Sequence, residues 1–282
     1  MKISLGTVQF GTKYGINNKN GIPSNQELLN IFTLAQNNHI KFLDTALAYG
    51  DAEKRVGQFF RKGFNVTSKF PYCNSQNELK DSLASTPRNL DFKNIYGYLA
   101  HNAYNLISVP ELWDTLQEFK EKNIISKIGY SIYSVEELNT LLEKKFIPDI
   151  VQVPFSILDR RFESKIKMLK NIGVEVHIRS IFLQGIFFIN FNDLPNKLQA
   201  FKPAIIELKK ICNDFAISIE SLALNYCIQN KNVDQVLVGV ETEEQLKKNL
   251  NAYNNCVLSE EIFERINSIS FEDDSILNPS NW

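Results

Sequence analysis

The sequence lacks several features that would each point to a particular class of protein. No apolar run approaches the roughly 20 residues of a membrane span, and the N-terminal segment 1–6 contains no apolar core of a signal peptide. The four cysteines are scattered without CxxC spacing and the three histidines are not clustered, so no zinc or other metal site is expected. We interpret the cysteines as reduced thiols of a cytoplasmic protein: Cys73, Cys212, Cys227 and Cys256.

An excess of charge of one sign is also missing. The 31 basic residues nearly balance the 32 acidic ones, and the formal net charge is -1. Nucleic acids and anionic membranes usually select proteins with basic patches, so neither is expected to be the main partner. Of the 282 residues, 44% are hydrophobic and 22% are charged. This composition allows a large core, and the length is ordinary for an α/β barrel.

What the chain does contain is a regular alternation of apolar, β-rich runs with amphipathic helical patterns. Helical patterns are typified by residues 25–38, 110–122, 135–145 and 220–229, and capping boxes begin at Ser134 and Thr242. The alternation predicts a single-domain (β/α)8 TIM barrel over residues 1–282. The eight runs predicted to be strands are residues 3–7, 40–44, 64–69, 95–101, 127–131, 149–153, 174–180 and 235–239.

The competing architecture is a doubly wound open sheet. That fold would need a glycine-rich turn such as GxGxxG between a strand and a helix, and none follows any predicted strand. The segment from Gly6 to Gly11 has only the outline of this motif, and we predict that it leads into a loop. Residues 187–203 are predicted to form an extended, irregular loop over the barrel mouth.

Four polar residues stand at the ends of predicted strands or directly after one. Asp44 ends the second strand, Lys69 the third and His101 the fourth, while Tyr49 follows the second in its loop. In a barrel of this kind the C-terminal ends of the strands surround one pocket. The four side chains are therefore expected to converge.

An acid, a phenol, an ammonium and an imidazole grouped in this way suit proton transfer to a carbonyl oxygen. Tyr49 would donate the proton, and the ammonium of Lys69 is expected to lower the pKa of the phenol. Asp44 would hold the Lys69 cation, because an unpaired buried charge is costly. His101 would donate a hydrogen bond to the carbonyl. No side chain supplies a hydride, so the pattern predicts a carbonyl reductase that takes it from a nicotinamide cofactor.

Each of these residues also has an ordinary structural interpretation. Asp44 and Lys69 could be a structural ion pair, and Tyr49 is one of 10 tyrosines. A lone histidine at a strand end, such as His101, is more often a simple hydrogen-bonding residue. Their joint occurrence at successive strand ends favours the catalytic interpretation.

The segment 42–50 (FLDTALAYG), followed by Glu53, resembles the signature of the aldo-keto reductase family. The similarity extends from residue 5 to about residue 250. It implies a (β/α)8 barrel that uses NADPH or NADH without a Rossmann domain. The family's catalytic tetrad would fall on Asp44, Tyr49, Lys69 and His101.

The resemblance also implies which residues bind the cofactor. Ser131 and Gln152, in segments similar to the family's strand-five and strand-six motifs, would hold the nicotinamide carboxamide, and Thr7 would lie near the nicotinamide. The complete implied set is Thr7, Asp44, Ser131, Gln152, Arg179, Ser180, Gln184, Gly239, Glu241, Gln245 and Asn249.

Arg179 departs from the family pattern, which often has an aromatic residue there that stacks on the nicotinamide. An arginine plane can also stack on a ring, and its charge would favour the reduced, uncharged nicotinamide. The alternative is that Arg179 pairs with a carboxylate at the barrel rim.

A second departure concerns the phosphate of NADPH. NADPH-specific members of the family usually have lysine or arginine where this chain has Glu241 and Gln245. A carboxylate would repel a 2′-phosphate but could accept a hydrogen bond from a free 2′-hydroxyl. We therefore predict a weakened preference for NADPH and hypothesise the use of NADH, although Lys247 or Lys248 could still reach a phosphate.

Residues 5–15 and 278–282 resemble a bacterial subgroup of the family that we associate with gene clusters for surface polysaccharides and unusual sugars. A keto- or aldehyde-bearing sugar, free or nucleotide-linked, is therefore one candidate for the small-molecule carbonyl substrate. The residues predicted to surround the substrate are Phe10, Tyr14, Tyr72, Tyr130, Phe155 and the loop after Gln184.

Two functions of other classes stay open. Some relatives bind NADPH while serving as partners of a channel, so a nicotinamide-binding regulatory subunit is one alternative. A barrel isomerase or epimerase that uses Lys69 or His101 without net redox change is the other. Turnover would argue against the first, and nicotinamide binding against the second.

Overall fold

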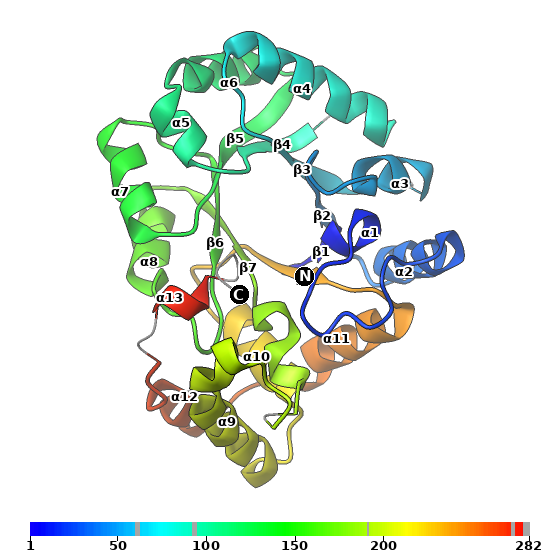
Figure 1. Cartoon of the computed structure of the whole chain (residues 1–282), viewed down its shortest axis with the longest axis vertical. Coiled ribbons are helices and arrows are strands. Elements are labelled where there is room, and N and C mark those ends of the chain that lie inside the picture. The colour runs from blue at the N-terminus through cyan, green and yellow to red at the C-terminus, as the bar shows by residue number, and fades with distance from the viewer. Residues whose placement is uncertain (60–62, 92–94, 191, 272–273, 279–282) are drawn as a thin grey trace.

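Eight parallel strands close into a barrel in which each strand pairs with its neighbours in sequence and β1 pairs with β8 (Figure 1). The computed structural model describes residues 1–59, 63–91, 95–190, 192–271 and 274–278. This is the predicted (β/α)8 TIM barrel, and the closed order excludes the open doubly wound sheet. The strands are β1 (Ile3–Gly6), β2 (Phe42–Asp44), β3 (Asn65–Phe70), β4 (Ile95–Ala100), β5 (Ile125–Ser131), β6 (Ile150–Pro154), β7 (Glu175–Arg179) and β8 (Gln235–Gly239).

Helices lie around the outside of the barrel (Figure 1). Within the described residues, none is long and apolar enough to cross a membrane. The helices are α1 (Val8–Gly11), α2 (Asn25–Asn37), α3 (Ala52–Phe59), α4 (Gln76–Leu90), α5 (Tyr104–Ser108), α6 (Glu111–Glu121), α7 (Val135–Glu143), α8 (Glu163–Asn171), η1 (Leu183–Phe188), η2 (Asn196–Phe201), α9 (Lys202–Asp214), α10 (Ile219–Ile228), α11 (Glu243–Asn255), α12 (Glu260–Asn267) and α13 (Asp274–Leu277).

The two predicted capping boxes differ in detail. At α7 the box is complete, because Ser134 accepts from the N–H of Glu137 and the Glu137 carboxylate accepts from the N–H of Ser134. At α11 the N-cap Thr242 accepts from the N–H of Gln245, but the Gln245 side chain accepts from the N–H of Glu241 at 2.7 Å. Glu241 is thereby tied to the start of α11.

Two irregular segments contain more helix than predicted. The segment from Gly6 to Gly11 includes the one-turn helix α1 before the chain enters a loop. Residues 187–203, predicted to be an extended loop, include the end of η1, all of η2 and the start of α9. The physical reason is apolar burial: Leu198 and Phe201 are buried, and the Phe201 ring stacks on Phe271 at 4.5 Å between centroids.

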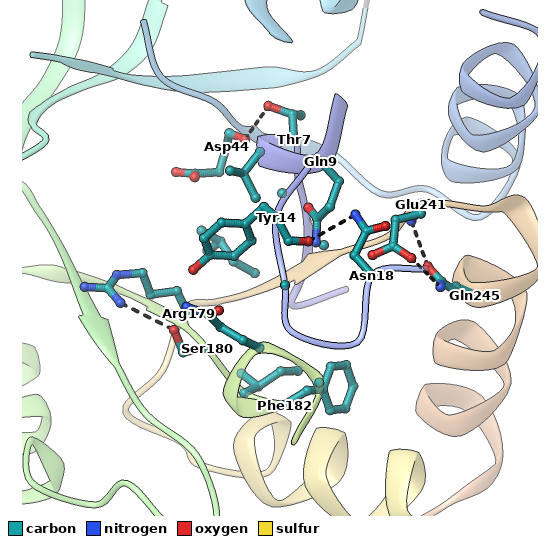
Figure 2. A pocket seen from close by; sticks show the side chains of 18 of the residues that line it. Thr7, Gln9, Tyr14, Asn18, Asp44, Arg179, Ser180, Phe182, Glu241 and Gln245 are labelled. Atoms are coloured by element: carbon teal, nitrogen blue, oxygen red, sulfur yellow. Dashed lines mark hydrogen bonds between the residues drawn. The ribbon is translucent and has the colours of Figure 1, made fainter. Parts of the chain in front are cut away.

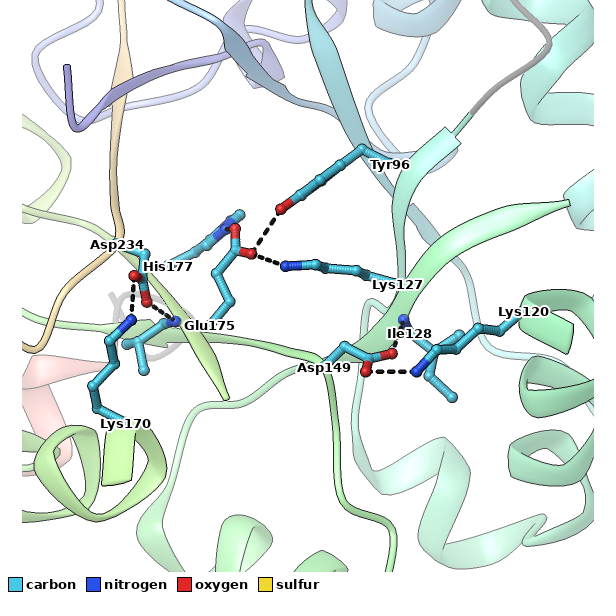
Figure 3. Close-up of polar contacts among 10 residues, drawn as sticks. Tyr96, Lys120, Lys127, Ile128, Asp149, Lys170, Glu175, His177 and Asp234 are labelled. Carbon is cyan, nitrogen blue, oxygen red and sulfur yellow. Dashed lines mark hydrogen bonds and ion pairs between the residues drawn. The ribbon is translucent and has the colours of Figure 1, made fainter. Parts of the chain in front are cut away.

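The N-terminal ends of the strands carry a polar network (Figure 3). Glu175 accepts hydrogen bonds from Tyr96 at 2.7 Å and from Lys127, and it contacts the ring of His177 at 2.6 Å. Burial acts to raise the pKa of Glu175, but the contacts with His177, Lys127 and Tyr96 together lower it to about 2. The carboxylate is thus ionised and fully bonded inside the barrel.

Two aspartates repeat one arrangement at this end of the barrel (Figure 3). Asp149 accepts from a backbone N–H of β5 and pairs with Lys120 at 2.6 Å. Asp234 accepts from a backbone N–H of β7 and pairs with Lys170. Each aspartate directly precedes a strand, β6 or β8, and its carboxylate accepts from a backbone N–H of the strand beside it. The three carboxylates at this end of the barrel, Glu175, Asp149 and Asp234, are thus all paired with neighbouring side chains or backbone groups.

Candidate active site

A cavity of about 420 Å³ opens at the C-terminal ends of the strands, where barrels of this type bind their ligands. It runs from Asp44 near the barrel centre to Glu241 and Gln245 at the start of α11 (Figure 2). Of the catalytic and cofactor-binding residues predicted from the sequence, only Lys69 does not line it. Its side chain is fully buried and contacts the wall residues Asp44 and Tyr49. The others line the wall: Thr7, Asp44, Tyr49, His101, Ser131, Gln152, Arg179, Ser180, Gln184, Gly239, Glu241, Gln245 and Asn249.

Lys69 lies at the centre of the predicted catalytic group. Its ammonium donates to Asp44 Oδ1 at 2.5 Å, to the backbone carbonyl of Thr45 at 3.0 Å and to the hydroxyl oxygen of Tyr49 at 3.4 Å. Thr67 is the register partner of Asp44, and Lys69, two residues further along β3, points to the same face of the sheet. Because the ammonium donates to the phenol oxygen, the phenol proton is left to donate elsewhere.

Burial decides the ionisation of this group. It lowers the pKa of Lys69, although the charge and hydrogen bond of Asp44 oppose the effect. Burial, followed by the charge of Asp44, raises the pKa of Tyr49. The predicted lowering of the Tyr49 pKa is therefore wrong in this structure, because desolvation of the phenolate and the charge of Asp44 outweigh the opposing charge of Arg179. Tyr49 is protonated at physiological pH, which the predicted role of proton donor requires.

His101 packs against Tyr49. The two rings meet edge to face, with centroids 5.4 Å apart and planes at 86°. His101 directly follows β4, and its backbone N–H donates to the carbonyl of Phe70 at 3.1 Å, which fixes it beside β3. Burial, with the charges of Lys69 and Arg179, lowers the pKa of His101 to about 3. The imidazole is therefore neutral at physiological pH and has one N–H to donate, as the predicted role requires.

Two further polar neighbours of Asp44 are Thr7, which directly follows β1, and Gln152 of β6. Gln152 donates from Nε2 to Asp44 Oδ2 at 2.7 Å, and Thr7 donates from its hydroxyl to the backbone carbonyl of Asp44 at 3.0 Å. Ser131 and Gln152 are register partners on β5 and β6 and both line the cavity. The two residues predicted to hold a carboxamide thus lie side by side.

Arg179 ends β7 and lines the cavity (Figure 2). Its guanidinium carbon lies 4.1 Å from the centroid of the Tyr133 ring. It donates to the backbone carbonyl of Ile132 at 3.1 Å and to the hydroxyl of Ser180 at 3.4 Å. Among the described residues no carboxylate pairs with Arg179, so the contacts do not support the alternative of a rim ion pair.

The opposite end of the cavity is formed by β8 and the start of α11. Glu241 is largely buried, and its carboxylate accepts a hydrogen bond from Gln245 Nε2 at 3.0 Å. Lys247 pairs with Glu243 at 3.0 Å and is not part of the cavity wall, whereas Lys248 is. Of the two lysines considered from the sequence, Lys248 is the one on the cavity wall.

The cavity wall fits a nicotinamide dinucleotide. Gln9 lines it, and the buried Oε1 atom of this residue has no hydrogen-bond partner in the described structure. A Cβ at Gly239 would lie 2.6 Å from the Gln9 side chain, so a glycine keeps this part of the wall open. An elongated cavity with polar groups at both ends and an unsatisfied amide oxygen matches a long, polar ligand.

Several residues of the wall were not predicted from the sequence, among them Gln9, Asn18 and Tyr133. Tyr133 lies two residues after Ser131, the last residue of β5. Gln9 lies similarly close to the end of β1. Both could have been found by extending each predicted strand end into its following loop, which is where barrels of this type place ligand-binding residues.

The predicted aromatic mouth is largely wrong. Tyr14 lines the cavity, as do Gly185 and Phe188 after Gln184, but Tyr72 is not part of the wall. Tyr130 precedes Ser131 in β5 and points to the opposite face, into the helical layer. The residues that are fully buried in the core instead are Phe10, Tyr130 and Phe155.

Comparison with known proteins identifies the family. The Aldo/keto reductase family profile matches residues 2–270, and the chain belongs to this family, whose members are NAD(P)H-dependent oxidoreductases. The chain is 25% identical over 224 residues to the NADH-specific methylglyoxal reductase of Escherichia coli (strain K12). That match covers 71% of this chain and 66% of the relative, just under two thirds of its length.

Solved structures of similar fold come from the same family. An aldo-keto reductase from Bacillus halodurans, in its holo form, has a TM-score of 0.78 and 20% identity, with 97% of this chain and 94% of that one covered. A glycerol dehydrogenase from Gluconobacter oxydans has a TM-score of 0.76 and 16% identity, with coverages of 95% and 90%. At these identities the likeness shows the fold. The subgroup resemblance in residues 278–282 lies outside the described residues from 279 onward.

Proposed function

We propose that this protein reduces an aldehyde or ketone to an alcohol with NADH or NADPH, and that Tyr49 is the general acid. The observation that carries the proposal is the set of contacts around Lys69, which joins Asp44 to the hydroxyl of Tyr49 at the wall of a ligand-sized cavity. His101 completes the group by packing on Tyr49.

Reduction adds a hydride to the carbonyl carbon and a proton to the carbonyl oxygen. A reduced nicotinamide supplies the hydride when it is bound. Tyr49 donates the proton, and the N–H that Lys69 directs at the phenol oxygen stabilises the phenolate that forms. Neutral His101 donates a hydrogen bond to the same carbonyl oxygen and orients it toward Tyr49.

The residues proposed to hold the cofactor divide between the two ends of the cavity. Ser131 and Gln152 would bind the carboxamide, and the guanidinium plane of Arg179 would cover the nicotinamide ring. Glu241 would face the adenosine ribose. Since its buried carboxylate disfavours a 2′-phosphate, we propose NADH as the preferred cofactor, in agreement with the NADH specificity of the Escherichia coli relative.

A sugar-derived carbonyl is the substrate class that the subgroup resemblance suggests. Tyr14, Phe182 and Phe188 line the outer part of the cavity, and aromatic faces of this kind can pack on sugar rings.

The test is a fluorescence titration of the purified protein with NADH and with NADPH, followed by turnover of the bound cofactor. Methylglyoxal, the substrate named for the relative, is the first carbonyl to add, and loss of reduced-cofactor absorbance is the readout. Binding with turnover is expected. Binding without turnover of any aldehyde or ketone tested would favour the regulatory subunit, and absence of binding to folded protein would favour the isomerase.

A further inference from the structure

Arg179 is a cation beside the proposed reaction centre that has no anionic partner among the residues the structure describes. Its two hydrogen bonds go to uncharged acceptors, the carbonyl of Ile132 and the hydroxyl of Ser180. A guanidinium has five N–H donors. Among the described residues, its other donors have no acceptor, and the side chain lines the cavity.

Within the described part of the chain, no other group of the cavity wall compensates the charge of Arg179. The Asp44 carboxylate is already bonded to the Lys69 ammonium at 2.5 Å, so this pair is neutral as a unit. His101 is uncharged at physiological pH because its pKa is lowered to about 3 by burial, Lys69 and Arg179. Burial raises the pKa of Tyr14 and of Tyr49, so both are neutral phenols.

Apart from Asp44, the acidic groups of the cavity wall belong to its far end. Glu241 accepts from Gln245 and lies across the cavity from Arg179 (Figure 2). Glu220 and Lys248 lie on the wall that the cavity shares with a groove between α10 and α11. The end of the cavity beside the catalytic group therefore carries one uncompensated positive charge.

We propose that Arg179 binds an anionic group of the substrate, so that the compounds reduced here are aldehydes or ketones carrying a carboxylate or phosphate close to the carbonyl. This inference rests on the proposed reductase function and names its substrate class. Stacking on the nicotinamide would use the face of the guanidinium, whereas binding an anion uses its edge, so the two roles are compatible.

Two physical arguments support an anion at this position. If a nicotinamide binds beside Arg179, its oxidised form would carry a positive charge there after each reduction, and a substrate anion would offset the repulsion. Arg179 is also held in place before any ligand arrives, by the end of β7, the Tyr133 ring and its two hydrogen bonds. A preorganised guanidinium loses little side-chain freedom on binding an anion.

The test compares matched anionic and neutral carbonyl compounds. Pyruvate and pyruvamide differ by a carboxylate, and dihydroxyacetone phosphate and dihydroxyacetone differ by a phosphate. The wild-type protein is expected to prefer at least one anion by about 10- to 100-fold in kcat/KM, the range of a charge-assisted hydrogen-bond pair. The two pairs distinguish a carboxylate from a phosphate.

Variants assign the preference to Arg179. Arg179→Met is expected to remove most of the anion-to-neutral ratio whatever the absolute rates, and Arg179→Lys to restore part of it. Lys13→Met is the matched control, because Lys13 carries the same charge on the loop near the mouth but is not part of the cavity wall. It is expected to leave the ratio unchanged.

A binding measurement separates this inference from the proposed function. Calorimetric titration of the cofactor-free protein with pyruvate or dihydroxyacetone phosphate should show binding that Arg179→Met weakens and Lys13→Met does not. If no carbonyl is reduced but an anion binds through Arg179, the proposed reductase function fails and the anion site stands. Failure of both anions to bind, or an equal ratio in wild type and Arg179→Met, would overturn the inference.

Discussion

Lys69 and Asp44 form an ion pair at 2.5 Å with side chains only 1% and 5% exposed. The pair is held by two neighbouring strands, β2 and β3, and it is connected to the cavity through Tyr49. A buried pair of this kind is weak evidence for stability by itself, since desolvation of both ions offsets their attraction. The hydrogen bond from Lys69 to the phenol of Tyr49 is the stronger argument that the pair takes part in catalysis.

The first prediction concerns the proton donor. Tyr49→Phe removes the phenolic proton and leaves the ring, so kcat for carbonyl reduction should fall by at least about 100-fold, while NADH affinity stays close to wild type. Turnover and fluorescence titration measure the two effects. Tyr72→Phe is the matched control, because Tyr72 is 49% exposed and lies outside the cavity wall, and its activity should be unchanged. Full activity in Tyr49→Phe would remove the proposed mechanism.

The second prediction concerns the buried ion pair. Lys69→Met leaves the Asp44 carboxylate buried without its cation and should lower the free energy of unfolding by about 3–5 kcal/mol. Lys122→Met is the control: it removes one partner of an exposed pair with Glu118 and should cost about 0–1 kcal/mol. Urea unfolding measures both. If both variants lost the same free energy of unfolding, other groups of the barrel would have to stabilise the Asp44 carboxylate.

The third prediction concerns Glu175, which lies at the N-terminal ends of the barrel strands. Its pKa of about 2 in the folded protein lies below its ordinary value of 4.5, so its contribution to stability is complete above pH 4.5 and is lost as the pH falls toward 2. Glu175→Gln should therefore be less stable than wild type at pH 7, and the difference should shrink below pH 4.5. Unfolding series in urea from pH 7 to pH 3 measure it. A difference that does not change with pH would contradict an ionised Glu175.

The fourth prediction concerns the pH response of His101. Its folded pKa of about 3 lies below the ordinary 6.5, so wild-type stability falls as the pH drops from 6.5 toward 3, when the unfolded chain takes up a proton that the folded site rejects. His101→Gln removes this loss, by at most about 1.4 kcal/mol per pH unit. Replacing the exposed His39 by glutamine is the control for a solvated imidazole. Parallel stability curves for wild type and His101→Gln would show that His101 titrates normally.

The fifth prediction concerns cofactor choice. Glu241→Arg replaces a buried carboxylate of the cavity wall by a cation and should shift the ratio of NADPH to NADH affinity toward NADPH by about tenfold or more. Glu244→Arg makes the same charge change at an exposed position outside the wall and should not alter the ratio. Titrations with both cofactors measure the ratio. If the two variants behave alike, Glu241 does not select the cofactor.

Much of the site could be predicted because it depends on the strand ends alone. A parallel barrel brings the C-terminal ends of its strands together whatever the intervening helices do, so Asp44, Tyr49 and His101 meet once the strand order is known. The period-two alternation of a strand explains why Ser131 faces the cavity while Tyr130 does not. The prediction that placed Tyr130 at the mouth ignored this alternation.

The sequence by itself determined the barrel, its strand order and the residues that gather at one end, because hydrophobic periodicity and strand-end chemistry are local properties of the chain. Only the tertiary structure decided that the Tyr49 pKa is raised, since desolvation depends on everything packed around the phenol. It also decided that Arg179 stacks on Tyr133 without a carboxylate partner among the described residues. Ion pairs and hydrogen bonds between side chains that are far apart in the sequence leave no local pattern in it. These contacts decide which charges of the cavity are compensated.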